Sequence, residues 1–367
     1  MLSRVLTDPV LTGIPFVDAH GAMRAGQLVE VCGVGGSGKT EILMQAAVNC
    51  ALPRERDGVR FGGCESSVLL LDLDGKFDTL RLLKILTARV EAALARETRD
   101  ARTNAPMPGL EGVLRKGPDG HKEADDALVR LSDSVYRESV GRFQMVRCHN
   151  SLDFLKALAV VDKIFERRES VVGTARETNP DATNDSYARG AARDGVGAAS
   201  AAPRRLLLVD NVAAFYWLDR ASRREHDAPL SLHNVHHVSA RALMEISRRC
   251  RAPVVATKAV AATKATSASD RFAEKPEPSD ASTARETTAH KDFLPPKWTS
   301  AVTQRLVLEP MEAFDDDRRL SHENDFGAER FRGRGGYGAS FVARWELPAG
   351  RPSARYRVDG EAGIRVV

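Results

Sequence analysis

A glycine-rich stretch between Gly33 and Thr40 has the residue types and spacing of a phosphate-binding loop. It matches the pattern G-x-x-x-x-G-K-[ST] in full. Backbone N–H groups of such a loop bind phosphate oxygens, and the helix that follows directs its positive end at the same anion. A lysine at this position neutralises the outer phosphates, and the next hydroxyl is a ligand for the Mg²⁺ of the nucleotide. The sequence therefore predicts a nucleotide-binding set of Gly33, Gly35, Gly36, Ser37, Gly38, Lys39 and Thr40.

The flanking residues supply the structural context that the motif needs. Residues 27–31 ("QLVEV") are typical of a short buried strand, and residues 40–52 have the apolar spacing of a helix. A glycine-rich turn that fits the pattern by chance is the alternative. The strand before the loop and the helix after it argue against that alternative.

Two acidic positions at strand ends are candidates to act with the loop. Asp210 ends the apolar run "RLLLVD" and is predicted to hold the metal, although a strand-end aspartate that caps the next turn is the alternative. Asp72 and Asp74 follow a second run, "SVLLLDLD". Either could orient the attacking water or simply begin the next turn, and the sequence leaves this open.

The elements that position these residues belong to an α/β fold. Unbroken apolar runs at 67–72, 142–148, 205–210 and 252–258 suit strands covered on both faces, which predicts a mostly parallel sheet flanked by helices. Residues 77–94 and 151–165 are expected to form crossover helices. We expect the first to bury a stripe of Leu80, Leu83, Leu86, Val90 and Leu94, and the second to be capped by Ser151.

The domain organisation predicted is a single domain over residues 1–367, with a core over 14–312 and C-terminal strands over 313–367. Three segments poor in large apolar residues, near 95–135, 172–203 and 262–292, are expected to be flexible insertions. After residue 296, short strand-like pieces such as "QRLVLE", "ASFVARW" and "SARYRVDGEAGIRVV" predict antiparallel strands that extend the sheet.

Composition bounds the class of protein. With 43% hydrophobic residues the chain has enough apolar groups for a substantial core. The net charge of +4, from 54 basic and 50 acidic residues, is too small to indicate a nucleic-acid partner by itself. The five cysteines form no C-x-x-C pair, so we expect a reducing compartment. There is no run of transmembrane length and no signal-peptide pattern, so we expect an intracellular protein without a membrane partner.

Four stretches resemble the RecA-like strand-exchange recombinases and, within them, the eukaryotic recombinase paralogues. They are "TGIPFVDAHGAMRAGQLVEVCGVGGSGKTEIL", "LLLDLDGKFDTLRLLKIL", "LLLVDNVAAFYWLDR" and "KWTSAVTQRLVLE". The resemblance extends over nearly all of the chain outside the three insertions. It implies a RecA-like P-loop ATPase core that uses ATP and Mg²⁺, without the small N-terminal helical domain of many relatives.

The resemblance also implies a function. It implies a nuclear protein of homologous recombination repair, active after DNA damage at double-strand breaks. Such paralogues act as mediators in a complex with other recombinase paralogues, notably the D paralogue. They help the main recombinase to assemble on single-stranded DNA, so single-stranded or branched DNA is an expected partner, directly or through the complex.

The chain departs from the family pattern at two positions. Family recombinases usually place a glutamate where Asp74 stands and use it to activate the hydrolytic water, and aspartate is one methylene shorter. Relatives also have a glutamine that couples the γ-phosphate to DNA after the fifth strand, where this chain has Thr257, Lys258 and Ala259. Because misplaced catalytic groups reduce rates by orders of magnitude, we expect ATP binding with slow or absent hydrolysis.

Further residues are weaker candidates. In the recombinase fold the loops after the fourth and fifth strands face DNA, which places Arg220, Arg223 and Arg224 there, but a solvated charged loop is an equal alternative. The aromatic triplet 215–217 fits core or partner packing better than base stacking. His233 and His237 have helical spacing for a metal, yet a plain helix surface is favoured.

Two other functions stay open. One is an active DNA-dependent ATPase of the strand-exchange type, in which Asp74 suffices as the base. The other is a small-molecule P-loop kinase, which the antiparallel C-terminal strands disfavour.

Overall fold

The computed structural model describes residues 9–19, 23–103, 120–177, 204–222, 231–260, 294–311, 340–360 and 363–367. Within these ranges the helices are α1 (Pro15–Asp18), α2 (Lys39–Ala51), α3 (Thr79–Thr103), α5 (Gly120–Arg142), α6 (Ser151–Glu177), α7 (Tyr216–Ala221), α8 (Leu232–Arg249) and α9 (Pro296–Ala301). The strands are β1 (Leu28–Gly33), β2 (Glu55–Arg56), β3 (Val59–Arg60), β4 (Ser67–Asp72), β5 (Phe143–Arg147), β6 (Arg205–Asp210), β7 (Val254–Ala259), β8 (Gln304–Pro310), β9 (Ser340–Leu347), β10 (Ala354–Asp359) and β11 (Gly363–Val366).

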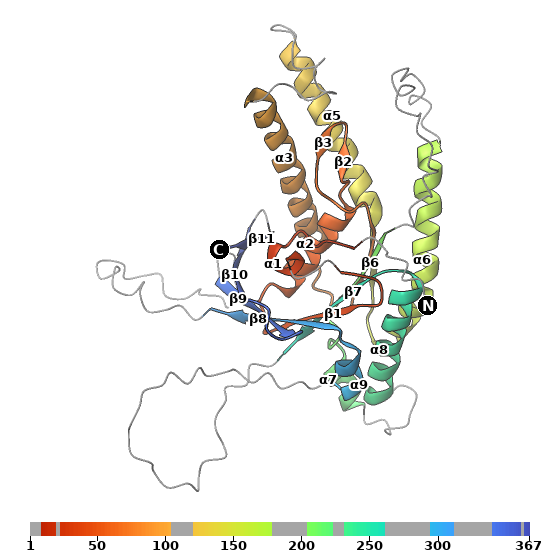
Figure 1. Cartoon of the computed structure of the whole chain (residues 1–367). Helices are drawn as coiled ribbons and strands as arrows, with labels where there is room; N and C mark the ends of the chain where they lie inside the picture. The colour runs from red at the N-terminus through yellow and green to blue at the C-terminus, as the bar shows by residue number, and fades with distance from the viewer. Residues whose placement is uncertain are drawn as a thin grey trace, which may run out of the picture.

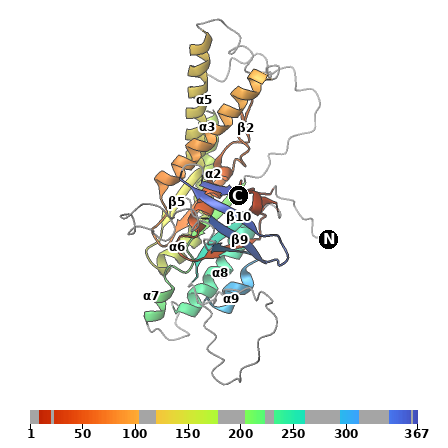
Figure 2. The ribbon, with the colours of Figure 1, turned by 90° about the vertical axis from the view of Figure 1, so that its left-hand side faces the viewer.

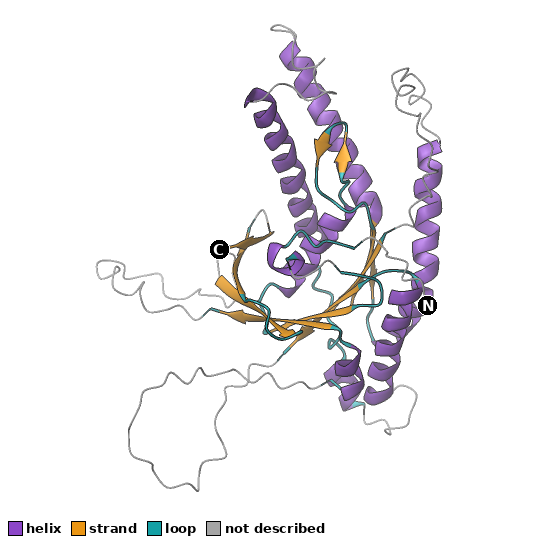
Figure 3. Ribbon diagram, viewed as in Figure 1, coloured by secondary structure: helices purple, strands orange, loops and turns teal. Residues whose placement is uncertain are grey.

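The main sheet of the described chain has nine strands in the order β11-β10-β9-β8-β1-β7-β6-β4-β5, and β2 pairs with β3 in a separate small hairpin. The six strands from β8 to β5 are parallel, and β9, β10 and β11 extend the sheet in antiparallel pairs (Figure 3). The fold predicted from the sequence, a mostly parallel sheet with antiparallel strands at the C-terminal side, is confirmed.

Helices cover both faces of the parallel part, as Figure 1 shows. The inward residues of β4 and β6 alternate between two apolar cores, with Leu70 and Leu208 in the core under α2, α3 and α5, and Leu69 and Leu207 in the core under α6 and α8. Because both faces are buried, the strand sequences are unbroken apolar runs. Strands β4 and β6 have the bounds that the sequence predicted.

The predicted flexible insertion near 95–135 is wrong at both of its ends. Residues 95–103 continue α3, and Gly120–Arg142 form α5, which packs against α3; the two helices extend beyond the sheet (Figures 1 and 2). Helix α5 has few large apolar side chains, but two of them, Leu131 and Val135, are buried and attach the helix to the core. Residues 172–177 likewise belong to α6. The rest of the three predicted insertions lies outside the described residues.

Three smaller predictions need correction. Of the predicted stripe of α3, Leu86 and Val90 are buried as expected, but Leu80, in the first turn, is 72% exposed, and the buried face also includes Leu82 and Ile85. The residue whose side chain caps α6 is Asn150, which accepts a hydrogen bond from the N–H of Asp153 at 2.9 Å, rather than Ser151. Strand β8, the "QRLVLE" run, is parallel to β1 and so belongs to the parallel part of the sheet.

No helix within the described ranges combines the length and the apolar character needed to cross a membrane.

Candidate nucleotide-binding site

The glycine-rich loop joins the carboxyl end of β1 to the first turn of α2, and three of its glycines have structural reasons to be glycine. Gly36 and Gly38 have positive φ angles of 75° and 79°, which a side chain disfavours. A Cβ on Gly33 would lie 2.6 Å from the carbonyl oxygen of Leu308 and 2.6 Å from Ser37 Oγ. Helix α2 begins at Lys39 with no side-chain cap, so the N–H groups of its first turn face the loop.

Lys39 folds its side chain back over the loop. Its Nζ donates hydrogen bonds to the carbonyl oxygens of Gly33 at 3.0 Å and Val34 at 2.6 Å. Burial lowers the pKa of this lysine from 10.5 to about 8, and the negative charges of Asp210 and Asp74 act against that shift. Lys39 is therefore a desolvated cation at the mouth of an anion-binding loop.

Asp210 lies beside Thr40 although 170 residues separate them in the sequence. The Thr40 hydroxyl donates to Asp210 Oδ2 at 2.8 Å, and the Thr257 hydroxyl donates to Oδ1. Burial raises the pKa of Asp210, while the hydrogen bonds from Thr257 and Thr40 lower it. The carboxyl ends of β1, β6 and β7 meet at one edge of the sheet, which brings these three side chains together.

The geometry distinguishes the two other acidic candidates. Asp72 is fully buried and forms an ion pair with Arg147 at 3.0 Å, and its Oδ1 accepts the N–H of Gly75. Asp74 is partly exposed and its carboxylate lies 3.5 Å from Lys76 Nζ. The charge of Asp74 acts on the pKa values of both Lys39 and Asp210. Asp74 is thus the more available of the two carboxylates near the loop.

At the end of β7, the polar side chains of Thr257 and Lys258 are bonded to neighbouring residues. Thr257 is hydrogen-bonded to Asp210, as described above. Lys258, 2% exposed, forms an ion pair with the fully buried Glu30 at 2.6 Å on the opposite side of the sheet from α2. Ala259 has no polar side chain to carry a signal from a phosphate.

Sequence reasoning missed three residues of this region, namely Thr257, Arg81 and Tyr356. Thr257 appeared only as part of a departure from the family pattern, yet it shares the carboxylate of Asp210 with Thr40. Arg81 and Tyr356 contact the loop and α2 from α3 and β10. In the sequence, each of these two residues stands out only as a polar or phenolic residue within an apolar pattern. Such residues are too common to identify a site.

The candidate DNA-binding arginines are only partly described. Arg220 lies on α7, where its guanidinium carbon is 5.6 Å from the ring centre of Trp217 and its Nη1 donates to the Tyr216 hydroxyl. Arg223 and Arg224 lie outside the described residues, as does most of the loop after β7. Of the aromatic triplet, Tyr216 is buried in the core, whereas Trp217 is 65% exposed.

The remaining candidate ligands are ordinary parts of helix and core. No group of three or more metal-ligating side chains occurs in the described ranges, and there the buried histidine of α8 is His236 rather than His233 or His237. The five cysteines are all buried and free.

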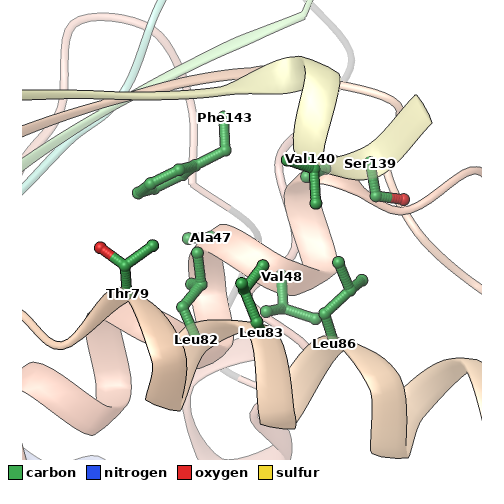
Figure 4. A pocket seen from close by; sticks show the side chains of 10 residues that line it. Ala47, Val48, Thr79, Leu82, Leu83, Leu86, Ser139, Val140 and Phe143 are labelled. Carbon is green, nitrogen blue, oxygen red and sulfur yellow. The ribbon is translucent and has the colours of Figure 1, made fainter. Parts of the chain in front are cut away.

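A cavity of about 120 Å³ lies between α2, α3 and α5 and is lined almost entirely by apolar side chains (Figure 4). Leu82, Leu83 and Leu86 of α3 face Val140 and Phe143 across it. No residue of the phosphate loop lines this cavity, so we regard it as a packing gap beneath the helices rather than as the nucleotide site.

Comparison with known proteins identifies sequence relatives that are DNA repair proteins. No family model matches the chain. A DNA repair protein XRCC2 homolog of Arabidopsis thaliana is 28% identical in a 322-residue alignment that covers 84% of this chain and 75% of that protein. This confirms the resemblance to the recombinase paralogues that the four motifs indicate.

Two further matches are more distant. The DNA repair protein XRCC2 of Mus musculus is 22% identical over 200 residues, which are 54% of this chain and 45% of the mouse protein. A crystal structure of the RadB recombinase aligns with 98% of this chain and 99% of its own, at 15% identity and a TM-score of 0.49. The strand order described above, rather than this alignment, is the basis for the fold.

Proposed function

We propose that this protein binds ATP with Mg²⁺ at the Gly33–Thr40 loop and acts in homologous recombination repair of DNA. The observation that carries the nucleotide site is the 2.8 Å hydrogen bond between Thr40 and Asp210. It joins the two side chains that a magnesium–nucleotide complex requires on one side of the phosphates. The sequence similarity to XRCC2 repair proteins supports the cellular role.

The donor set fits magnesium. The Thr40 hydroxyl and the Asp210 carboxylate offer oxygen ligands, which Mg²⁺ prefers to nitrogen or sulfur. When bound, the metal would neutralise phosphate charge. The chain's own residues do the remaining work: the loop amides and Lys39 hold the phosphates, and Thr257 fixes the orientation of Asp210 through Oδ1.

Slow or absent hydrolysis is the second part of the proposal. Ala259 offers no side-chain group to couple the γ-phosphate to DNA, and the carboxylate of Asp74 is drawn toward Lys76. A nucleotide held this way acts as a structural ligand or an assembly signal. We therefore propose a nuclear mediator that works in a complex with other recombinase paralogues, the D paralogue among them, and supports recombinase assembly on single-stranded DNA.

An active DNA-dependent ATPase is the second candidate, and the position of Asp74 favours it. This carboxylate is close enough to influence the pKa values of Lys39 and Asp210. A water held between Asp74 and the terminal phosphate would then be activated by general-base catalysis.

Phosphate release and co-purification distinguish the two candidates. Phosphate release is measured with and without single-stranded DNA, for the unmodified chain and for Lys39→Ala and Asp74→Ala. The mediator proposal predicts ATP binding that Lys39→Ala abolishes, with little turnover, and recovery of recombinase paralogues in stoichiometric amounts from nuclear extracts. Turnover stimulated by DNA and lost in Asp74→Ala would support the ATPase instead, and absence of the paralogues would remove the mediator role.

A further inference from the structure

The C-terminal hairpin of β10 and β11 packs directly on the phosphate loop. The hydroxyl of Tyr356, on β10, donates a hydrogen bond to the carbonyl oxygen of Ser37 at 2.7 Å. The tyrosine is fully buried, and its ring packs against Phe16 and Phe341 with centroid separations of 5.5 and 5.4 Å. Two aromatic rings therefore hold this ring in place, and its hydroxyl is aimed at the loop.

Two further contacts fasten the same hairpin to the first half of α2. Gln45 Oε1 accepts the backbone N–H of Ile364, on β11, at 2.8 Å. Arg81 forms an ion pair with Glu41 at 2.9 Å and also donates to the carbonyl oxygens of Asp359 and Gly360. Arg81 is 4% exposed. The contacts of Arg81 join α3, α2 and the hairpin at Glu41, one residue beyond Thr40.

The Tyr356 hydrogen bond determines which way a loop amide points. A trans peptide is planar, so the C=O of Ser37 and the N–H of Gly38 point in opposite directions. Holding that carbonyl toward β10 turns the Gly38 N–H away from the hairpin. On the same side, a Cβ on Gly38 would meet Val358 Cγ2 at 3.1 Å, so the backbone also fits closely against the strand.

We propose that Tyr356 is a positioning residue for nucleotide binding: it locks the Ser37–Gly38 peptide so that the Gly38 amide is presented to a phosphate. This inference rests on the proposed function, because it assigns a role at the same nucleotide site. The C-terminal hairpin is then part of the binding apparatus, and the loop and hairpin are energetically coupled. By reciprocity, a nucleotide on the loop stabilises the hairpin to the extent that the hairpin favours the nucleotide.

Tyr356→Phe is the central variant, because it removes the hydroxyl and keeps the ring. Tyr136→Phe, on α5, is the matched control. Affinity for a fluorescent ATP analogue in Mg²⁺ is expected to fall about three- to tenfold in Tyr356→Phe, the effect of one lost neutral hydrogen bond, and to stay unchanged in the control. Equal affinity of Tyr356→Phe and the unmodified chain would overturn the proposal.

Hydrogen exchange of the nucleotide-free proteins tests the same contact without any ligand. Peptides covering residues 33–40 should exchange faster in Tyr356→Phe than in the unmodified chain and in Tyr136→Phe, and the melting temperature is recorded for each. Unchanged exchange in this peptide would overturn the positioning role. If the peptide exchanges faster in Tyr356→Phe but the unmodified chain binds no nucleotide, the contact between Tyr356 and the loop stands. The proposed function is then refuted, and with it the role of Tyr356 in binding.

Nucleotide itself supplies the reciprocal readout. Saturating ATP and Mg²⁺ should slow exchange in peptides covering the hairpin residues 354–366 of the unmodified chain, and slow it less in Tyr356→Phe. A general effect on folding would change peptides of α6 and α8 as well. Protection confined to the loop, with none in the hairpin, would contradict the coupling.

Discussion

His236 is a buried histidine of α8, and its titration sets part of the acid stability of the protein. The side chain is 5% exposed, its Nε2 has no hydrogen-bond partner among the described residues, and the Tyr216 ring lies 6.3 Å from it. Burial lowers the pKa of His236 from 6.5 to about 4. The folded chain therefore keeps this ring neutral in a pH range where the unfolded chain protonates it.

The sign follows from the direction of the shift. Below pH 6.5 the unfolded state binds a proton that the folded state refuses, so the free energy of unfolding falls as the pH falls, until the folded pKa near 4 is reached. At pH 5 the loss is about 2 kcal/mol, at roughly 1.4 kcal/mol for each pH unit below the unfolded pKa. Burial raises the pKa values of Asp18 and Asp210, and these groups change the stability in the opposite direction as the pH falls. The pH dependence of the unmodified chain alone therefore does not measure the contribution of His236.

A matched pair of variants isolates the contribution of His236. His236→Gln removes the titrating group, and His237→Gln changes the neighbouring exposed histidine in the same way. Urea unfolding is followed by circular dichroism at pH 7 and pH 5. The unmodified chain and His237→Gln should lose about 2 kcal/mol more between these pH values than His236→Gln does. Equal losses in all three proteins would refute the argument that burial holds this histidine neutral.

Two predictions concern packing and buried charge. Glu30→Gln should destabilise the fold by about 3–5 kcal/mol in urea unfolding, because it removes the buried carboxylate charge that pairs with both Lys258 and Arg305. Glu30→Leu combined with Lys258→Met and Arg305→Met should cost much less, and equal costs would contradict this. Leu82→Ala should cost about 2–5 kcal/mol because it enlarges the cavity beneath α3, whereas Leu80→Ala should change thermal stability little. A larger effect at Leu80 would place the buried stripe of α3 where the sequence pattern alone predicted it.

The sequence predicts the centre of the sheet well, and the reason is physical. Runs such as "SVLLLD" and "RLLLVD" are apolar between their end residues because helices cover both faces of β4 and β6, and their short length is typical of strands. The parallel order of strands then brings their carboxyl ends to one edge. This is why a loop at residues 33–40 and an aspartate at 210 meet, as the motif and the strand-end position predicted.

The elements that the sequence did not predict depend on contacts between distant segments. Helix α5 is polar over most of its length and is held by a narrow apolar seam against α3 that includes Val135. Tyr356 sits in an alternating strand pattern that gives no sign of the Ser37 carbonyl it reaches. Propensity and periodicity report the local environment of a residue, and these contacts are set by tertiary packing.

Calorimetric titration with ATP, in the presence and absence of Mg²⁺, tests the central claim most directly. We predict that the unmodified chain binds ATP and that binding weakens when Mg²⁺ is removed, because Thr40 and Asp210 supply oxygen ligands on the same side of the loop. Asp210→Asn should bind with little dependence on Mg²⁺. No binding heat from the unmodified chain, or the same Mg²⁺ dependence in Asp210→Asn, would contradict the account.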